Sequence, residues 1–507
     1  MSQTTLDKAP GTRGTPGGDA DKRRWWVLVI ISIAQLMVVL DATIVTVALP
    51  DAQADLGMSD ANKQWVVTAY ALAFGALLLL GGRIADFWGR KKAFVTGMIG
   101  FALASALGGA AQNEIMLFGS RALQGVFAAL LAPAALAMLT VTFTEAKERA
   151  KAFAVYGGIS AGGAAIGLLL GGVLTEYASW RWCLLVNVPI AILAIVAAMP
   201  IMRESRAHGD TRYDIPGAVT VTLGLAALVY GFTRAAEESW TDSLTVAMLV
   251  IGVALLVVFT YIESRTNHAL LPLRIVADRN RGGALLVMLL VGAAFIGSTL
   301  FMIYYMRIVL GYGAVKAGAG ALGITAGVLV TAGASAALLP KIGPRIPLFV
   351  GSLLAAGGTF WLTFITVERQ YVTHMLPGMV LIGLGLGLVF TSVSSTALIG
   401  IGEHDAGAAS ASINAVQQVG GALGTALLNS VATSATDSFI ADKKASLGAQ
   451  LADPAVQQKL FFDSQLDGYT TAFAWAAAIM VVGAILAAVL VNAGKDALPS
   501  EGAVHMG

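Results

Sequence analysis

Fourteen stretches of about twenty mostly apolar residues dominate this chain, and each is long enough to cross a bilayer as a helix. Hydrophobic residues make up 57% of the sequence and charged residues only 12%, whereas about 25% of the residues in soluble domains are charged. Backbone amides inside a bilayer need hydrogen bonds within their own segment, which a helix provides. The sequence therefore predicts an all-α membrane protein with fourteen transmembrane helices. The predicted spans are 25–49, 64–82, 93–111, 114–139, 152–174, 182–201, 215–235, 243–262, 283–307, 313–338, 347–367, 374–400, 407–432 and 469–492.

The Lys and Arg residues are distributed unevenly between the two sides of the membrane. An even number of spans places both termini on one side, and 22 of the 32 Lys and Arg fall on that side. Nine fall on the other side and Arg121 lies within a span, whereas Asp and Glu divide almost equally. Loops rich in Lys and Arg stay in the cytoplasm. We therefore expect a multi-pass protein of the cytoplasmic membrane with both termini in the cytoplasm.

Polar stretches mark the parts of the chain that lie outside the membrane. Residues 1–24 are polar and rich in Gly and Thr, so we expect a disordered cytoplasmic N-terminus. The basic stretch 263–282 is expected to lie along the cytoplasmic face of the membrane. Residues 433–468 are expected to form an extracellular loop with one or two short amphipathic helices, and residues 493–507 a cytoplasmic tail.

A short repeat relates two parts of the chain. The sequence "GRKKAFVTG" at 89–97 resembles "GPRIPLFVG" at 343–351, since each has Gly at both ends and a cation soon after the first Gly. Each stands on the predicted cytoplasmic side, between the second and third of six successive spans. Two six-span halves related by an axis along the membrane normal are a known transporter arrangement. We therefore predict halves at 25–201 and 283–492, with an inserted helix pair at 202–262.

Two charged residues lie deep within predicted spans, Asp41 in the first and Arg121 in the fourth. An ionisable residue there costs about 2.5–3.5 kcal/mol, which favours a functional role over a helix-packing hydrogen bond. Arg121 cannot lose its proton and needs an anionic or carbonyl partner. At a rise of 1.5 Å per residue, both side chains lie about 12–14 Å below the outer surface. We predict that Asp41 binds a proton or a cationic substrate and is coupled to Arg121, directly or through water and Gln124. Bonding of Arg121 to backbone carbonyls is the alternative.

The stretch "GGRIADFWGRKK" at 81–92 places five charges between two apolar spans. Gly82 and Gly89 are expected to permit a tight turn there. Asp86 is expected to accept hydrogen bonds from a helix N-terminus or to pair with Arg90. A basic anchor at the inner leaflet is the simpler interpretation. Glycine together with a lone acid among cations is more than such an anchor requires.

The chain resembles the fourteen-span drug:proton antiporters of the major facilitator superfamily, over residues 20–495. The resemblance rests on "LDATIVTVALP" (40–50), "GGRIADFWGRKK" (81–92), "RALQGVFAA" (121–129) and "GGISAGGAAIGLLLGGVLT" (157–175) followed by "SWRW" (179–182). It implies the major facilitator fold, with transport by alternating access. It assigns proton or cation coupling to Asp41 and Arg121. It assigns a conformational switch that latches the two halves to Gly82, Asp86, Gly89 and Arg90.

The resemblance also assigns a role to the glycines of the fifth span. Gly163, Gly167 and Gly171 follow one another at intervals of four residues and share one helix face. In the family such glycines form a flexible seam that controls leakage, together with prolines. Here Ala164 and Leu168 stand where the prolines are expected. Close packing of small residues is therefore an equally weighted interpretation.

We predict a proton-coupled antiporter that exports amphipathic drug-like compounds, with cations among the candidates. Export of a solute against a hundredfold concentration gradient costs about 2.8 kcal/mol. Moving one proton charge down a potential of 100 mV provides about 2.3 kcal/mol. One or two protons per cycle therefore suffice. The rivals are a nutrient importer on the same fold, a polytopic enzyme and a sensing receptor. The candidate substrate contacts are Gln35, Tyr70, Gln124, Tyr156, Tyr304 and Asn414, within a wider set that adds Phe74, Asn187, Tyr305 and Gln417.

The sequence points to no catalytic, cofactor or metal chemistry. It has a single cysteine, Cys183, and neither a Cys/His cluster with metal-ligand spacing nor a phosphate-binding GxxxxGK[ST] loop. The expected partners are a small-molecule substrate, protons and the lipid bilayer, and not nucleic acid. We expect a monomer that is not an enzyme.

Overall fold

The computed structural model describes residues 19–143, 145–206, 214–266, 270, 273–367, 371–397, 399 and 406–493, and the regular structure of these residues is entirely helical. The first helices are α1 (Asp19–Leu56), α2 (Trp65–Trp88), α3 (Arg90–Gly109), α4 (Glu114–Thr142), α5 (Ala146–Tyr177), α6 (Trp182–Leu185), α7 (Asn187–Ile201), α8 (Ile215–Glu237) and α9 (Ser243–Arg265). The others are α10 (Leu273–Val276), α11 (Arg279–Tyr304), α12 (Ala314–Ile342), α13 (Arg345–Trp361), α14 (Leu376–Ala397), α15 (Ala406–Leu447) and α16 (Pro454–Leu490). Short turns of other helix types are η1 (Tyr305–Val309), η2 (Leu362–Phe364), η3 (Tyr371–Met375) and η4 (Gly448–Ala452).

Each of the fourteen predicted spans coincides with a helix or with two consecutive pieces of helix. Eleven stretches of the described residues are long and apolar enough to cross a membrane, and α2, bent by 55°, makes a twelfth. The two other predicted spans are α5, whose described apolar part is the shorter stretch Gly162–Tyr177, and α15, which is rich in Gly, Ala, Ser and Thr. The all-α multi-pass architecture is confirmed, and the count of fourteen spans remains a prediction.

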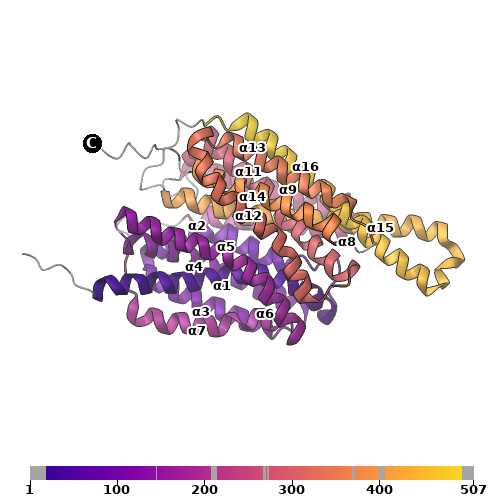
Figure 1. Cartoon of the computed structure of the whole chain (residues 1–507), viewed down its shortest axis with the longest axis horizontal. Helices are drawn as coiled ribbons and strands as arrows, with labels where there is room; N and C mark the ends of the chain where they lie inside the picture. Colours follow the sequence, from indigo (N-terminus) through magenta and orange to yellow (C-terminus); the bar gives the residue numbers. More distant parts are fainter. Residues whose placement is uncertain are drawn as a thin grey trace, which may run out of the picture.

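The helices form two bundles that lie side by side (Figure 1). Helices α1 to α7 pack together in the first half, chiefly α2 on α4, α3 on α4 and α1 on α5. Helices α11 to α16 pack together in the second half, chiefly α11 on α15, α12 on α14 and α13 on α14. Between the halves, α5 packs on α12 and α2 on α15. These four helices therefore form the main contacts between the two halves.

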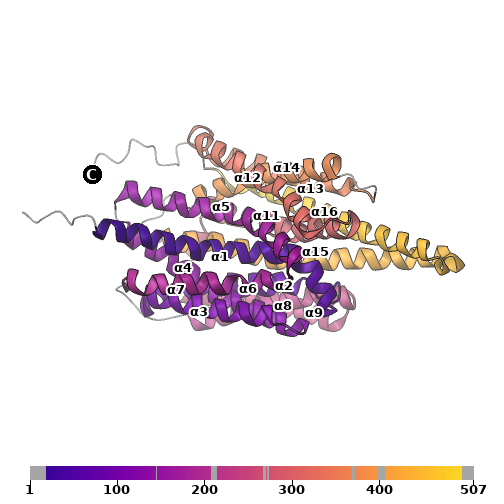
Figure 2. The same ribbon diagram turned by 60° about the horizontal axis from the view of Figure 1, so that its bottom comes forward.

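Helices α8 and α9 form a pair that packs against both halves. The two helices run along each other, and α8 also contacts α2 of the first half and α15 of the second (Figure 2). The Gln64 side-chain amide donates to the Thr233 hydroxyl at 2.8 Å, joining the start of α2 to α8. The inserted pair therefore covers one side of the seam between the halves rather than lying apart from them.

The stretch 433–468 differs from its prediction. It contains no separate short amphipathic helices, because α15 continues without a break to Leu447 and α16 begins at Pro454. The two helices project together beyond the rest of the protein as a hairpin that is closed by η4 (Figures 1 and 2). Asp453 caps the start of α16, because its side chain accepts a hydrogen bond from the Ala455 amide at 2.9 Å. Aspartate is one of the preferred residues for pairing the free amides at the start of a helix.

The repeat found in the sequence occupies equivalent places in the two halves. Gly89 separates α2 from α3 with a φ of 127°, and Gly343 separates α12 from α13 with a φ of 74°. Positive φ values favour glycine at both points. Eight residues further on, Gly97 lies against Leu131 of α4, and Gly351 against Gly385 and Leu388 of α14. The two motifs therefore make the same helix–turn–helix arrangement.

The ends of the chain and the central linker differ in part from prediction. Helix α1 begins at Asp19, so helix extends into the stretch expected to be disordered, while residues 1–18 and 494–507 lie outside the described residues. In the linker, α9 continues to Arg265 and α10 forms a single helical turn. Residues 267–269 and 271–272 lie outside the described part of the linker.

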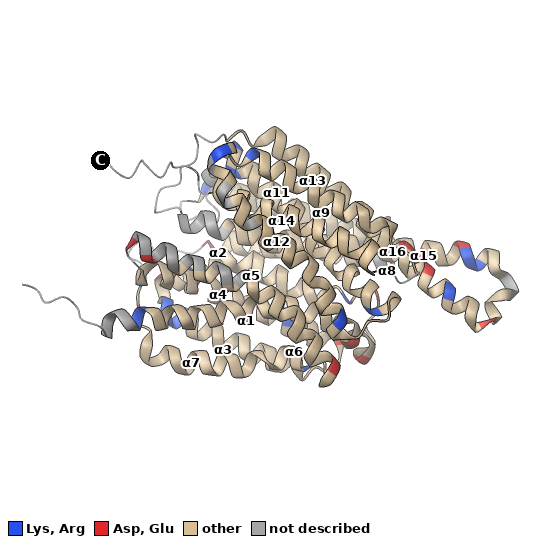
Figure 3. Ribbon diagram, in the orientation of Figure 1, with Lys and Arg blue, Asp and Glu red and all other residues tan. Residues whose placement is uncertain are grey.

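Charged side chains distinguish the two ends of the bundle (Figure 3). We call the end at which α1 begins and α16 finishes the basic face, and the end at which α1 finishes the opposite face. The basic face carries Arg23, Arg24, Arg90, Lys91, Lys92, Arg279, Arg281, Lys341 and Arg345. The opposite face carries Asp and Glu mixed with a smaller number of cations.

Candidate functional site

The two charges embedded in the first half form a direct ion pair. Arg121 of α4 donates from Nη1 to Asp41 Oδ2 of α1 at 2.6 Å, and the side chains of the two residues are 1% and 0% exposed. Arg121 also donates from Nε to the Val66 carbonyl oxygen at 2.9 Å, and its guanidinium lies 4.5 Å from the centre of the Tyr70 ring. Both interpretations of Arg121 from the sequence therefore apply, because it pairs with Asp41 and with a backbone carbonyl.

Polar side chains from three helices complete this buried group, which we call the Asp41 cluster (Asp41, Ser105, Arg121, Gln124 and Asn187). Asp41 Oδ1 accepts from Gln124 Nε2 and from Asn187 Nδ2, each at 2.8 Å. Gln124 Oε1 in turn accepts from Arg121 Nη1 at 2.7 Å. The Ser105 hydroxyl of α3 accepts from Gln124 at 2.6 Å and from Asn187 at 3.4 Å. The cluster therefore connects α1, α4 and α7 through one carboxylate, and the amides of Gln124 and Asn187 connect it to α3.

The Asp41 carboxylate is surrounded by donors. Charge-assisted hydrogen bonds are about twice as strong as neutral ones. Removing one partner of a buried pair costs about 3–5 kcal/mol. The contacts of Asp41 therefore contribute to holding α1 against α4 and α7.

A second group of contacts joins the halves at the opposite face. Here α1 continues past Pro50, and Asp51 forms an ion pair with Arg307 of η1. Gln53 accepts a hydrogen bond from the Tyr304 hydroxyl of α11 at 2.5 Å. Glu176 of α5 accepts from the Val315 amide of α12 at 2.8 Å. We call these three contacts the opposite-face gate.

Neighbouring contacts strengthen this end of the interface. Asn429 of α15 donates to the Asp60 and Ala61 carbonyl oxygens at 2.9 and 3.2 Å. Lys63 is 3% exposed, pairs with Asp60 at 2.8 Å, and lies 4.2 Å from the centre of the Tyr304 ring. Burial lowers the pKa of the Lys63 ammonium, while the Asp60 carboxylate opposes that change. The two halves are therefore held together at the opposite face in this conformation.

The motif "SWRW" supports the same end of α1 from within the first half. Asp55 Oδ2 accepts from the Trp180 indole at 3.0 Å and from Arg181 at 2.5 Å. The hydrogen bond from Arg181 is the largest cause of a lowered pKa at the exposed Asp55 carboxyl. Arg181 also donates to the Ala111 carbonyl oxygen at 3.0 Å. The end of α1 is thus fastened to its own half by Asp55 and to the other half by Asp51.

In the loop between α2 and α3, Asp86 pairs with Arg90, which is one of the two contacts expected for it. Arg90 donates to Asp86 Oδ1 from Nε at 3.0 Å and from Nη2 at 2.8 Å. Glu204, just after α7, accepts from the Lys91 and Lys92 amides at 3.1 and 3.2 Å and so caps α3. These partners belong to the first half, so this conformation shows the loop fastened to its own half and not to the second.

The expected role of Gly82 in the turn is wrong. Helix α2 continues to Trp88, so Gly82 lies within the helix, where a Cβ would lie 3.4 Å from the Pro133 ring. The turn is made by Gly89 alone, and a side chain there would collide with the Glu204 carboxylate as well as disfavour the positive φ. Helix α2 continues through Gly82, because glycine is tolerated inside packed membrane helices.

The three glycines of α5 allow close approach to α1. A Cβ on Gly163 would lie 3.1 Å from Leu36, and one on Gly171 would lie 2.8 Å from the Ile44 carbonyl oxygen. A Cβ on Gly167 would overlap the Thr43 hydroxyl and lie 3.1 Å from the Leu40 carbonyl oxygen. Close packing is therefore the structural role that these glycines have here.

The residues expected to contact substrate lie in separate places. Tyr70 and Gln124 belong to the surroundings of Asp41, and the Tyr156 hydroxyl donates to Gln35 Oε1 at 2.5 Å between α5 and α1. Tyr304 is part of the opposite-face gate, and Asn414 is exposed on α15. These six residues do not line one cavity in this conformation, since sequence spacing does not determine which way each helix is turned.

The sequence does not single out several residues of these sites. Asn187 belongs to the wider set of polar residues, and its position in "LLVNVPI" marks it as a lone amide in an apolar span. Ser105, Asp51, Arg307 and Glu204 carried no distinguishing signal except that Asp51 follows Pro50. Their importance comes from partners that are distant in the chain.

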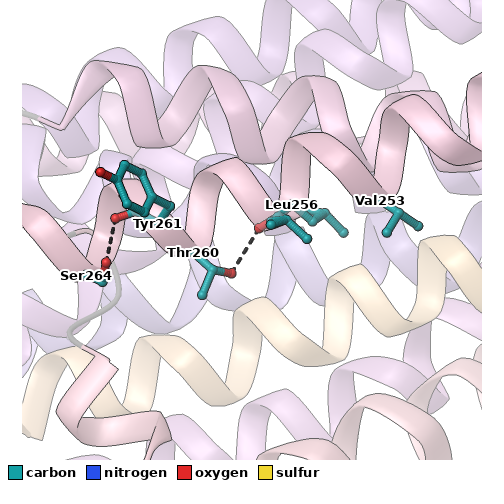
Figure 4. A pocket seen from close by; sticks show the side chains of 6 residues that line it. Val253, Leu256, Thr260, Tyr261 and Ser264 are labelled. Carbon is teal, nitrogen blue, oxygen red and sulfur yellow. Dashed lines mark hydrogen bonds between the residues drawn. The ribbon is translucent and has the colours of Figure 1, made fainter.

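Two further features bear on ligand binding. Among the described residues, no group of three His, Cys, Asp or Glu could hold a metal ion. An open hollow of about 500 Å³ lies along α9 and is lined by Val253, Leu256, Val257, Thr260, Tyr261 and Ser264 (Figure 4). The hydroxyls of Thr260 and Ser264 donate to carbonyl oxygens of α9 itself at 2.9 and 2.6 Å, which suits an apolar surrounding.

Comparisons with known proteins agree with this architecture. A family model described as Major Facilitator Superfamily matches residues 31–425. The puromycin resistance protein pur8 of Streptomyces alboniger is 48% identical over 490 residues, covering 96% of this chain and 95% of that protein. The cephamycin export protein CmcT of Amycolatopsis lactamdurans is 38% identical over 428 residues, covering 83% of this chain and 87% of that protein.

Solved structures resemble the chain in fold. A bacterial homologue of the human lysosomal transporter Spinster, solved in an inward-facing and occupied conformation, has a TM-score of 0.64 at 16% identity, over 94% of this chain and 99% of that structure. Sequence and fold thus lead to the same conclusion: the chain belongs to the major facilitator superfamily.

Proposed function

We propose that this protein is a proton-coupled exporter of amphipathic drug-like compounds and that Asp41 is its proton-binding residue. The observation that carries the proposal is the ion pair of Asp41 with Arg121 in the interior of membrane-spanning helices. A charge in such a place is costly, and where it occurs it usually serves a substrate or proton pathway. The relatives are a resistance protein and an export protein for antibiotics, which favours export over import. Puromycin, an amphipathic amine, is the first substrate to test.

Coupling follows from the contacts of α1. A proton on Asp41 removes the negative charge that holds Arg121, Gln124 and Asn187 around this helix. The contacts of α1 with α4 and α7 then weaken. Because α1 also carries Asp51 and Gln53, a movement of α1 reaches the opposite-face gate. Protonation and opening of the gate are thus linked through one helix.

The basic face is the cytoplasmic face in this proposal, because Lys and Arg are retained on that side. With the opposite-face gate closed, substrate enters from the cytoplasm, and opening of the gate releases it outside. The Asp86–Arg90 pair acts as the latch that exchanges partners when the halves move. The glycine face of α5 is the surface along which α1 moves during this change. The protein acts as a monomer with both termini in the cytoplasm.

The test uses everted membrane vesicles from cells that produce the protein. Acidification of the vesicle interior should drive accumulation of radiolabelled puromycin, a protonophore should abolish it, and ATP should not replace the proton gradient. Vesicles with Asp41→Asn should show no gradient-driven accumulation. Accumulation that requires ATP or sodium would contradict proton coupling, and higher uptake into intact producing cells would favour the nutrient importer.

A further inference from the structure

Asn187 is the one member of the Asp41 cluster that has an unused acceptor. Its side chain lies at the start of α7 and is 0% exposed. Its Nδ2 donates to Asp41 Oδ1 and to Ser105 Oγ, whereas its Oδ1 is buried and has no hydrogen-bond partner among the described residues. A buried carbonyl oxygen without a donor costs about 1–3 kcal/mol. Such an atom next to a titrating group calls for an explanation.

The carboxylate faces only donors in this arrangement. Arg121 Nη1, Gln124 Nε2 and Asn187 Nδ2 all donate to Asp41. A protonated carboxyl has a hydrogen of its own to donate, and at Oδ2 this hydrogen would point at the Arg121 guanidinium. The proton must therefore reside on Oδ1, and one of the two amides there must turn to present its oxygen.

Gln124 cannot turn without a new conflict. Its Oε1 accepts from Arg121 Nη1 at 2.7 Å, so a turned amide would place Nε2 against that donor. The Asn187 oxygen holds no such partner. A half-turn of the Asn187 amide would place Oδ1 where Nδ2 now stands, 2.8 Å from Asp41 Oδ1 and 3.4 Å from Ser105 Oγ. There it would accept from the protonated Asp41 and from the Ser105 hydroxyl.

We propose that Asn187 is a positioning residue that reports the protonation state of Asp41: its side-chain amide donates to the carboxylate and turns over to accept from the carboxyl. This inference rests on the proposed role of Asp41. In the step itself, an O–H bond forms at Asp41 Oδ1 with a proton from the aqueous phase, and no other covalent bond changes. Titratable or charged groups that interact with Asp41 are Arg121 of α4, Tyr70 of α2 and Cys183 of α6, and α3 and α7 present the neutral Ser105 and Asn187.

The turn of the amide would transmit protonation to α7. In the carboxylate state Asn187 binds α1 and α3 as a donor, and in the carboxyl state it binds them as an acceptor. Asn187 is the first residue of α7, and Val186 before it keeps a helical backbone that continues from α6. A change in the bonds of Asn187 therefore acts directly on the start of α7.

The test is infrared difference spectroscopy of the full-length protein in lipid bilayers between neutral and acidic pH. The carboxyl C=O band of Asp41 is identified by its loss in Asp41→Asn. In Asn187→Leu this band should move to higher frequency, because the carboxyl loses the acceptor of its proton. In Asn187→Ser, whose hydroxyl can donate or accept, it should stay close to the wild-type position. Asn429→Leu is the matched control, since Asn429 is another buried amide with an unpaired Oδ1 but binds the Asp60 and Ala61 carbonyls instead.

The outcomes separate the two proposals. An Asp41 band that does not move in Asn187→Leu, or that moves equally in Asn429→Leu, overturns the role of Asn187 and leaves Asp41 as the proton site. The absence of any pH-dependent band that disappears in Asp41→Asn overturns both. If Asn187→Leu fails to fold, the side-chain amide band of Asn187 itself is followed in the wild-type protein. This band is identified by its absence in Asn187→Ser. It must fall in frequency on acidification, because the amide carbonyl gains hydrogen-bond donors. An unmoved amide band likewise overturns the inference.

Discussion

Asp51 and Arg307 form an ion pair although 256 positions separate them in the chain. The pair joins the last part of α1 to η1 and thereby joins the two halves at the opposite face. The Asp51 side chain remains 38% exposed and that of Arg307 15%. A partly exposed pair of this kind contributes up to about 1 kcal/mol, which is suited to a contact that has to open in every transport cycle.

Loss of this ion pair should open the gate more often. Arg307→Gln should raise the labelling rate of a cysteine at position 52, where Ala52 is 3% exposed, by up to about fivefold, since 1.4 kcal/mol corresponds to a factor of ten. The measurement is modification by a membrane-impermeant maleimide added outside, in a Cys183→Ser background. Arg234→Gln is the control, because Arg234 pairs with Glu238 and Asp242 beside the α8–α9 connection. Unchanged labelling, or no recovery in the exchanged pair Asp51→Arg with Arg307→Asp, would count against the gate.

Asp41→Asn should separate exchange from proton-driven transport. Asparagine has nearly the shape of a protonated carboxyl but cannot release a proton, so the coupled step is lost. We expect gradient-driven export to fall to background while exchange of labelled for unlabelled substrate across proteoliposomes continues. Gln124→Glu provides a comparison within the same cluster, since it adds a carboxyl without removing Asp41. Normal gradient-driven export in Asp41→Asn would place the proton site elsewhere.

Arg121→Gln should impair gradient-driven transport. The substitution removes the cation that pairs with Asp41 at 2.6 Å and leaves the carboxylate buried without this partner, and breaking a buried pair in this way costs about 3–5 kcal/mol. We expect slower gradient-driven export together with a lower unfolding temperature in detergent. The rate of substrate export from proteoliposomes is measured, with Arg121→Lys as the variant that keeps the charge. Unchanged gradient-driven export in Arg121→Gln would mean that Arg121 serves only to pack α4 on α2.

Asp86→Asn should slow transport without reducing the amount of protein in the membrane. The substitution removes the negative charge that pairs with Arg90 but keeps the shape of the side chain and one oxygen that can accept. If the loop only anchors the protein through its cations, Asp86→Asn should leave transport unchanged, and Arg83→Gln, which removes a cation from the same loop, should impair it. If the loop is a latch, Asp86→Asn should impair transport more than Arg83→Gln does. Export rate and membrane abundance are measured together for both variants.

Gly167→Val should disturb the contact between α5 and α1. A Cβ at this position meets the Leu40 carbonyl oxygen and the Thr43 hydroxyl, and overpacking of a tight contact costs about 1–3 kcal/mol. We expect a lower unfolding temperature in detergent and slower transport. Gly162→Val in the same helix is the matched control, because nothing lies within 4 Å of a Cβ there. Equal effects of the two substitutions would show that helix propensity and not packing is responsible.

The sequence by itself determined the helical class, the positions of the spans and the two embedded charges. The physical reason is that a bilayer requires about twenty apolar residues per helix and makes every charge within them conspicuous. The equal depth expected for Asp41 and Arg121 is consistent with their ion pair, because helix rise depends only on residue number. The repeat at Gly89 and Gly343 was likewise recognisable, since positive φ at a turn selects glycine.

Only the tertiary structure decided how the helices are turned and which of them meet. It placed Gln124, Asn187 and Ser105 around Asp41 but moved Tyr304 to the opposite-face gate. It also showed that α15 and α16 continue into a hairpin, because a helix need not end where its apolar pattern ends. Local patterns specify where a helix runs, whereas its rotation and its neighbours depend on packing between residues that lie far apart in the chain.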